Sequence, residues 1–260
     1  MRTLSRRVNL LGLGTLLAIA VVWQLADALG LVSFRYIPSP AEVLDSGSSL
    51  LASGELQQNL THTLSAALLG WFNACAIAVP AGVVIGLSRV VWTSTMASLD
   101  ALRALPIVGF VPVAVLLFGF TMSMEIVVAT YAAIWPILLN TIAGLRAAPP
   151  RSLEVAKMMQ FGRLRTLWAV RLPIATPYIV VGLRLGLSLS LVLALVAEIV
   201  GNPAGLGYAL VEAGQSLQPG TMFAYIIAIG LAGIALNAVL MTVARLGFRG
   251  QMSVAGEDVS

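Results

Sequence analysis

Six apolar blocks dominate this sequence, each about 17 to 25 residues long, the length that a helix needs to cross a hydrocarbon core about 30 Å thick. They lie at 9–29, 62–87, 99–119, 125–143, 177–199 and 223–246. Runs such as Ile174 to Val200 are apolar on all sides, whereas barrel strands alternate over about 10 residues. The sequence therefore predicts an all-α integral membrane protein with six transmembrane helices.

The composition supports a bilayer as the solvent for most of the chain. Of its 260 residues 59% are hydrophobic and only 10% are charged, and the mean hydropathy is +0.95. A soluble domain carries about 25% charged residues, and a disordered chain has few apolar ones. The net charge of +4 does not indicate nucleic acid, because that interpretation needs bases clustered on a soluble face.

The basic residues predict the orientation. An even number of spans places 1–8, 88–98, 144–176 and 247–260 on one side, which holds Arg2, Arg6, Arg7, Arg89, Arg146, Arg151, Lys157, Arg163, Arg165, Arg171 and Arg249. The opposite segments, 30–61, 120–124 and 200–222, hold only Arg35. Because loops rich in Lys and Arg stay in the cytoplasm, we expect both termini inside, in a multi-pass protein of the plasma membrane.

The first block has a second interpretation as a cleaved signal peptide. Three arginines precede it, and Ala26-Asp27-Ala28 resembles a small-residue cleavage site. However, the run from Val8 to Ala26 is longer than a signal core of about 7 to 15 residues, and Trp23 is placed like an interfacial anchor. An uncleaved first span is favoured.

Cysteine, histidine and lysine are too rare for several chemistries. Cys75 and His62 are single, which excludes a disulfide framework, a thiolate cluster and a His-based triad, so we expect neither a metal site nor a catalytic residue. For His62, a role in a solute pathway competes with an ordinary interfacial position. Lys157 is the only lysine, and no phosphate-binding loop is present. We therefore expect no cofactor on this chain, and any ATP must be bound by another chain.

Polar residues inside the blocks are candidates for a translocation pathway, because such residues are costly in lipid. Snorkelling or pairing is the competing role for the two arginines. The candidates are Arg103, Asn140, Arg184, Glu198 and Asn237.

Two glycine pairs, Gly82 with Gly86 and Gly182 with Gly186, have the small-xxx-small spacing that lets helices approach closely. They predict either packing within one chain or a seam between two copies.

The segment 144–176 is the longest basic loop, with six bases against the single acid Glu154. Ser152 is placed to cap a helix from Leu153 to Gln160, and Leu164 to Val170 forms a second helix that Leu172-Pro173 stops. Two short helices at a membrane face predict either a lipid-surface anchor or a docking site for a cytosolic protein.

The spacing within this loop resembles the EAA loop of ATP-binding cassette (ABC) importer permeases, whose pattern is E-A-A, three residues, G, nine residues, I-x-L-P. Glu154-Val155-Ala156 and Val170-Arg171-Leu172-Pro173 occupy its two ends. The glycine position holds Gln160, with Gly162 two residues later. We name residues 144–176 the coupling loop.

Other motifs resemble the nitrate, taurine and aliphatic sulfonate branch of these permeases over about residues 36–246. They include Ile37-Pro38-Ser39-Pro40, Arg103-Ala104-Leu105-Pro106, Asn140 to Arg146, Gly182-Leu183-Arg184 and Val196-Ala197-Glu198 followed by Gly205-Leu206-Gly207-Tyr208. The branch also includes carriers of bicarbonate, pyrimidine vitamin precursors and aromatic acids, so the resemblance leaves the substrate open.

The resemblance implies a type I importer permease fold and transport by alternating access. The region 1–61 would form the N-tail, first helix and outer loop, 62–246 a five-helix permease core, and 247–260 a cytoplasmic tail. Two permease chains, as a homodimer or paired permease, would bind cytosolic ABC ATPases and an extracytoplasmic binding protein. The coupling residues would be Glu154, Val155, Ala156, Lys157, Gln160, Gly162, Arg163, Leu172 and Pro173.

Two other classes are weighed against this interpretation. A gradient-driven transporter or channel predicts internal repeats, broken helices and carboxylates at span centres, which the sequence does not display clearly. A membrane enzyme predicts a cluster of ionisable residues on one side, whereas the candidates here are scattered along the chain.

Overall fold

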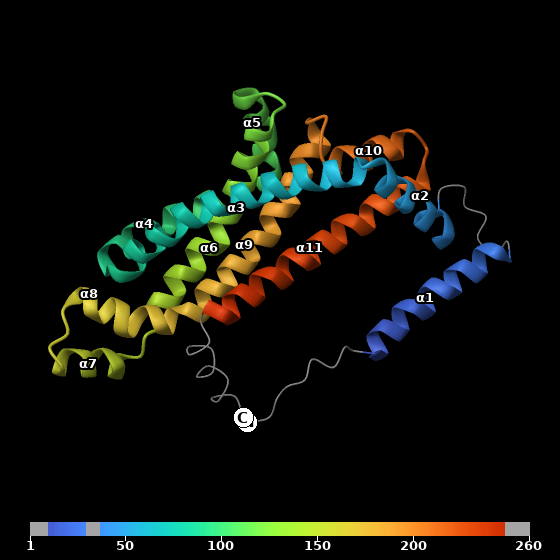
Figure 1. The fold of residues 1–260 in the computed structure, drawn as a ribbon. Coiled ribbons are helices and arrows are strands. Elements are labelled where there is room, and N and C mark those ends of the chain that lie inside the picture. Colours follow the sequence, from blue (N-terminus) through green and yellow to red (C-terminus); the bar gives the residue numbers. More distant parts are fainter. Residues whose placement is uncertain (1–9, 30–36, 248–260) are drawn as a thin grey trace. The chain divides into compact units, whose positions relative to one another are not determined.

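The computed structural model describes residues 10–29 and 37–247, and all regular elements within these ranges are helical (Figure 1). In chain order they are α1 (Leu10–Ala28), α2 (Pro40–Ser53), α3 (Glu55–Leu87), α4 (Arg89–Arg103), η1 (Ile107–Gly109), α5 (Phe110–Phe118), α6 (Met122–Arg146), α7 (Pro150–Met158), α8 (Arg163–Thr166), η2 (Leu167–Arg171), α9 (Leu172–Val200), α10 (Leu206–Gln215) and α11 (Pro219–Gly247).

The chain divides into two compact units. Unit 1 combines the described residues up to Gln58 with Ala209–Ala228, and unit 2 combines Asn59–Tyr208 with the described residues from Ile229 onward. The helices α3, α10 and α11 each contribute to both units.

Four helices of the described chain are long and apolar enough to cross a membrane: Glu55–Leu87, Met122–Arg146, Arg163–Val200 and Pro219–Leu246. They contain the blocks predicted from 62, 125, 177 and 223, and α1 coincides with the first predicted block. The prediction of an all-helical membrane protein is confirmed. The terminal tails and Arg35, on which the predicted orientation also depends, lie outside the described residues.

The third predicted span, 99–119, is wrong as one straight helix. Its residues are shared by α4, η1 and α5, and the two arms are bent by 73° at the break. Pro106 lies in this break. Proline has no N–H to donate and disfavours the helical conformation of the residue before it, so the α4 helix ends at Arg103 and a new helix starts after the bend.

In unit 2, α3 and α9 both pack on α6 through glycines. A Cβ atom added to Gly82 of α3 would lie 2.7 Å from the Cβ of Thr141 on α6, and Gly86 is also closely packed on that helix. On α9, Gly182 and Gly186 face α6 in the same way. Both small-residue pairs therefore serve packing within the chain, which decides between the two roles predicted for them.

Polar side chains in this helix packing bond to the backbones of neighbouring helices. Trp71 of α3 donates its indole N–H to the carbonyl of Leu183 on α9, at 2.9 Å. Ser190 of α9 donates its hydroxyl to the carbonyl of Ala67, at 2.6 Å. Such bonds satisfy groups that would otherwise be unpaired in an apolar interior.

The coupling loop forms two helical pieces, but their ends differ from the prediction. The first, α7, begins at Pro150 with Pro149 at the N-cap, so Ser152 lies inside the helix and does not cap it. Pro is favoured at the first helical position, where the missing N–H costs nothing. The predicted start at Leu153 was therefore three residues late.

The second piece does not stop at Leu172-Pro173. Instead α8, η2 and α9 form one continuous helix over Arg163–Val200, with π-helical turns at Leu167–Arg171 directly before Pro173. A π-turn spaces its hydrogen bonds five residues apart. This local change of spacing lets the helix pass a residue that has no N–H.

Hydrogen bonds and a contact between aromatic rings join the elements of unit 1. Ser39 and Glu42 form a capping box at the start of α2, with Glu42 N–H bonded to the Ser39 hydroxyl at 3.2 Å. Tyr225 of α11 donates its hydroxyl to Glu55 of α3, at 2.7 Å. The ring of Phe223 lies 6.1 Å from that of Trp23 in α1.

Candidate functional site

The coupling loop turns sharply after α7 through backbone hydrogen bonds. The N–H of Phe161 bonds to the carbonyl of Ala156, and the N–H of Gln160 bonds to that of Lys157, both at 2.9 Å. These two bonds define a Schellman motif, whose αL residue is usually glycine. Gln160 takes that place with φ of 54°. The glycine of the EAA pattern thus corresponds to a left-handed position, which this chain fills with glutamine.

Apolar side chains of the coupling loop are exposed. Met158 is 84% and Leu164 is 74% accessible, and Val155, Met159 and Trp168 are also exposed. Ala156 is the buried residue of α7. Glu154 and Lys157 lie exposed on the same short helix. The loop therefore presents a mixed apolar and charged surface.

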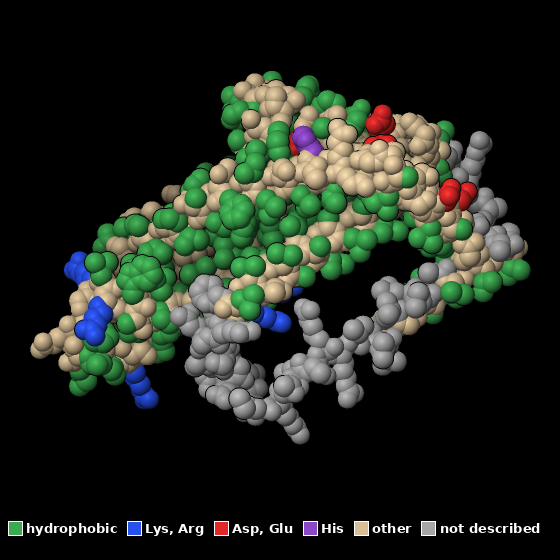
Figure 2. Space-filling view, viewed as in Figure 1, with side chains coloured by type: hydrophobic (Ala, Val, Ile, Leu, Met, Phe, Trp, Pro, Cys, Tyr) green, Lys and Arg blue, Asp and Glu red, His purple; other side chains and the backbone are tan. Residues whose placement is uncertain are grey.

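Beside this surface lies an open cleft of about 820 Å³. Four of its lining residues are basic: Arg89, Lys157, Arg163 and Arg171. None of these four forms an ion pair with a carboxylate of the described chain. Figure 2 shows Lys and Arg side chains gathered around α7 and α8. The arrangement attracts anionic groups.

The remaining coupling residues frame this surface. Gly162 is the N-cap of α8. The guanidinium of Arg165 lies 4.2 Å from the ring centre of Phe161, which holds the two sides of the turn together. Leu172 and Pro173 open α9 directly after the π-turns.

The structure disperses the five predicted pathway residues. Arg103 pairs with Asp100 one turn earlier, at 3.0 Å, and both side chains are about half exposed. Asn140 donates to the carbonyl of Pro136 in its own helix, at 2.8 Å. Arg184 is exposed on α9, and the side-chain oxygen of Asn237 is buried without a partner among the described residues. No hydrogen bond or ion pair joins any two of the five within the described chain.

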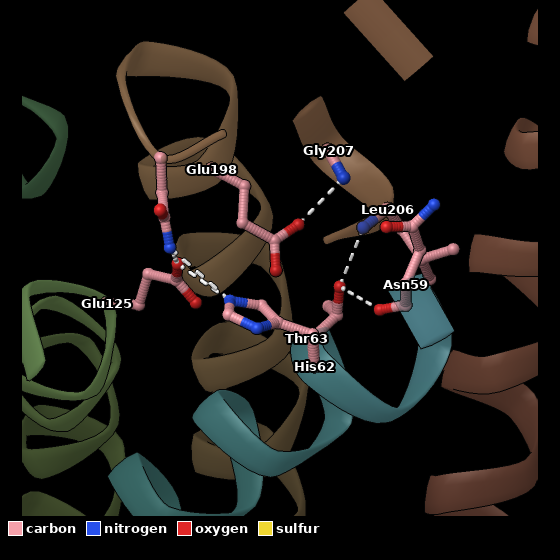
Figure 3. A network of polar contacts seen from close by, with 8 residues as sticks. Asn59, His62, Thr63, Glu125, Glu198, Leu206 and Gly207 are labelled. Carbon is pink, nitrogen blue, oxygen red and sulfur yellow. Dashed lines mark hydrogen bonds and ion pairs between the residues drawn. The ribbon is translucent and has the colours of Figure 1, made fainter. Parts of the chain in front are cut away.

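Glu198 is the exception, because it lies in a group of polar side chains at the ends of α3, α6 and α9 that is buried except for a partly exposed histidine (Figure 3). We name His62, Glu125, Glu198 and Asn202 the polar cluster. The Nε2 atom of His62 lies 3.1 Å from Oε1 of Glu125, and the amide of Asn202 donates to the same oxygen. Both glutamates are fully buried.

The loop after α9 and the first residues of α10 hold Glu198 in place. The N–H of Gly207 donates to Oε2 of Glu198, at 2.7 Å. Gly205 has φ of +93°, and a Cβ atom there would collide with the Glu198 carboxylate. The hydroxyl oxygen of Thr63 on α3 accepts the N–H of Leu206, at 2.9 Å, and so connects the start of α10 to the same helix that carries His62.

Sequence reasoning did not single out Glu125 or Asn202. Glu125 is the only acid between Asp100 and Glu154, which is a usable signal, but it stands at the predicted boundary of a span and reads as an interfacial residue. Asn202 lies in a loop whose glycines suggested only a turn.

A comparison with known protein families covers the coupling loop and most of the polar cluster. A family model described as "binding-protein-dependent transport system inner membrane component" matches residues 78–249, which include the coupling loop. The chain belongs to this family. It is a permease, so the predicted family is confirmed, while the role of the EAA-like loop stays a prediction.

Similar curated proteins include two from Escherichia coli. The taurine transport system permease protein TauC is 30% identical over 251 residues, which cover 95% of this chain and 88% of TauC. The aliphatic sulfonates transport permease protein SsuC is 32% identical over 233 residues, covering 89% and 88% of the two chains. The SsuC protein of Bacillus subtilis is 30% identical and covers 83% of this chain and 78% of its own.

Solved structures share the fold. A chain of the inward-facing MetNI methionine ABC transporter superposes with a TM-score of 0.58 at 19% identity and covers 71% of this permease and 94% of its own length. An amino acid ABC transporter with histidines gives 0.57 at 17% identity, with 78% and 96% covered. The type I importer permease fold is thereby confirmed. This chain is the transport subunit of an ABC importer and not its ATPase.

Proposed function

We propose that this permease forms the membrane pathway of an importer whose separate cytosolic ATPase docks on the coupling loop. The observation that carries the proposal is the exposed surface of α7 and α8, where Met158 and Leu164 are largely accessible. Contiguous exposed apolar groups with a charged rim favour a protein partner. ATP is then bound and hydrolysed by the partner chain.

Within this surface, each coupling residue has a distinct proposed role. Glu154 contacts the ATPase, and Lys157 and Arg163, beside the basic cleft, pair with its acidic side chains. Val155 supplies apolar contact, while buried Ala156 anchors α7. The turn at Gln160 and Gly162 fixes the angle between α7 and α8, and Leu172 and Pro173 join the docked segment to α9.

We further propose that the coupling loop and both termini face the cytoplasm of a bacterial-type plasma membrane. The six bases of the loop against one acid support this orientation. The family description as an inner membrane component agrees with the location. An extracytoplasmic binding protein would then deliver solute to the opposite side.

A homodimer is the proposed assembly. The helices α3 and α9 approach α6 so closely at their glycines that a Cβ atom would already clash. This packing favours an aqueous pathway between two chains over one inside unit 2, and a two-fold axis places identical surfaces around such a pathway. Alternating access follows when the two ATPases move the docked loops together.

For the substrate, we propose a small organic or inorganic anion of the sulfonate, taurine or nitrate class. The names of the similar E. coli proteins, which refer to taurine and aliphatic sulfonates, support this class. The dispersal of Arg103, Asn140, Arg184 and Asn237 favours selection by the binding protein over a tight site in the permease.

Docking is tested by purifying the tagged permease in mild detergent and identifying copurified chains by mass spectrometry. We expect a P-loop ATPase with the wild type and its loss with Glu154→Ala or Met158→Glu. Glu212→Ala removes an exposed acid outside the coupling loop and is the matched control, which should retain the ATPase. An ATPase that stays bound to both loop variants would refute the docking surface.

The substrate class is tested by growth of a strain lacking the permease gene. We expect no growth on taurine or an alkanesulfonate as sole sulfur source and recovery with the wild-type gene. Normal growth of the deletion strain, with loss of uptake of nitrate, an aromatic acid or a pyrimidine precursor instead, would move the assignment to that solute.

A further inference from the structure

The polar cluster brings three metal-ligating side chains together from distant parts of the sequence. His62 lies on α3, Glu125 in the first turn of α6, and Glu198 near the end of α9. One ligand atom from each lies within 4.8 Å of the other two. The prediction of no metal site followed from the single histidine and single cysteine of the sequence, whereas in the structure carboxylates supply two of the three candidate ligands.

The spacing of these atoms suits a small cation. Two ligands bound at about 2.0 to 2.1 Å in tetrahedral geometry lie about 3.3 Å apart, and at right angles about 3.0 Å. His62 Nε2 and Glu125 Oε1 are separated by 3.1 Å. The ligand atom of Glu198 lies within 4.8 Å of the other two, so binding a cation would require it to approach by up to about 1.5 Å.

Two buried oxygen atoms of the cluster are without a partner. Neither Oε2 of Glu125 nor Oε1 of Glu198 has a hydrogen bond among the described residues, although both glutamates are fully buried. In Figure 3 the second oxygen of Glu198 points toward the imidazole of His62. Buried polar atoms are normally satisfied, so orphaned carboxylate oxygens indicate an absent partner.

The charges indicate the kind of partner. No Lys or Arg of the described chain pairs with either glutamate, and burying a carboxylate without compensation is strongly unfavourable. One divalent cation would neutralise two carboxylates and leave the imidazole neutral, the form in which it acts as a ligand.

We propose that His62, Glu125 and Glu198 bind a divalent transition metal of the zinc class. One imidazole with two carboxylates is a zinc-type ligand set, and three protein ligands leave a position for water. Gly205 and Gly207 position the Glu198 carboxylate by close approach and by an N–H bond. The metal would join the ends of α3, α6 and α9 that lie opposite the coupling loop.

The test uses the full chain with an affinity tag that contains no histidine, so that His62 remains the only histidine. The protein is purified in detergent, stripped with EDTA and titrated with Zn²⁺, with metal content measured by mass spectrometry and unfolding followed thermally. We expect one Zn²⁺ per chain and a thermal midpoint that rises with Zn²⁺.

Variants assign the ligands. His62→Gln, Glu125→Gln and Glu198→Gln keep side-chain size similar and should each weaken Zn²⁺ binding at least tenfold, whereas Asp45→Asn on α2 should leave it unchanged. If a variant aggregates, the Zn²⁺ content and Zn²⁺-dependent midpoint of the wild type still decide. A wild type that binds no Zn²⁺, or binds it equally after His62→Gln, overturns the proposal.

Discussion

The left-handed turn at Gln160 gives a quantitative prediction for the coupling loop. A non-glycine residue in the αL conformation costs about 1 to 2 kcal/mol, and Gln160 adopts it with φ of 54°. Glycine relieves this cost but loses about 0.5 to 1 kcal/mol more backbone entropy on folding. The net effect of Gln160→Gly is a stabilisation of the turn by about 0.5 to 1 kcal/mol.

Two further variants separate this effect from a general response to substitution. Gln160→Val places a β-branched residue at positive φ and should destabilise the turn by about 1 kcal/mol. Met159→Gly is the matched control, because the neighbouring residue has an ordinary φ of −79°. There, glycine brings only the entropic loss, about 0.5 to 1 kcal/mol.

Hydrogen exchange of the loop amides in detergent measures the local stability. The bonds donated by Gln160 and Phe161 close the turn, so a gain of about 0.7 kcal/mol slows their exchange about threefold. Gln160→Gly should slow exchange while Met159→Gly and Gln160→Val accelerate it. The reasoning is refuted if Gln160→Gly accelerates exchange as much as Met159→Gly does.

Three other predictions concern the free energy of unfolding in detergent, measured from thermal or denaturant midpoints. Ser39→Ala removes the α2 capping box and should lower the free energy of unfolding by about 1 kcal/mol. The control Ser48→Ala loses only an exposed local hydrogen bond and should change it by less than about 0.5 kcal/mol. Equal effects would contradict the capping role. Gly205→Ala should lower the free energy of unfolding by about 2 to 4 kcal/mol, because φ is +93° and the new Cβ would collide with Glu198. The control is Gly54→Ala, where φ is +79° but the space is open, so only the backbone strain of about 1 kcal/mol is expected. An equal loss at both sites would argue against the contact with Glu198. Gly182→Ala should lower the free energy of unfolding by about 1 to 3 kcal/mol, since its Cβ would lie 2.8 Å from the Cβ of Asn140. Gly230→Ala, which has open space around it, should instead stabilise α11 by about 0.5 to 1 kcal/mol. Stabilisation at both sites would show that α9 and α6 are not closely packed.

The sequence predicted the long helices well because a span is defined by its own residues. A run such as that from Ile174 to Val200 is apolar at every position, so no tertiary information is needed. The bend at Pro106 had a local signal, but the apolar residues on both sides concealed it. Pro173 also predicted the end of a helix, but there the helix continues, because π-turns precede the proline.

The two candidate sites also differ in how far the sequence alone could predict them. The coupling loop is contiguous, so the spacing from Glu154 to Pro173 was enough to predict it. The polar cluster depends on how α3, α6 and α9 pack, and His62 is separated from Glu125 by 63 positions. No pattern within one segment predicts that contact. Glu198 was noticed for its cost in lipid, but its partners become visible only in three dimensions.

The unbroken helix from Arg163 to Val200 is long enough for a small tilt to displace both of its ends considerably. At 1.5 Å per residue, Arg163 and Glu198 are about 50 Å apart along its axis, and the helix has 38 residues with its π-turns at one end. Tilting a rigid rod of this length by about 10° around its middle displaces each end by about 4 to 5 Å, a shift comparable to one helical turn. If the ATPase docks on α8 as proposed, its movement would therefore displace the far end of α9 by a distance comparable to the size of a small solute.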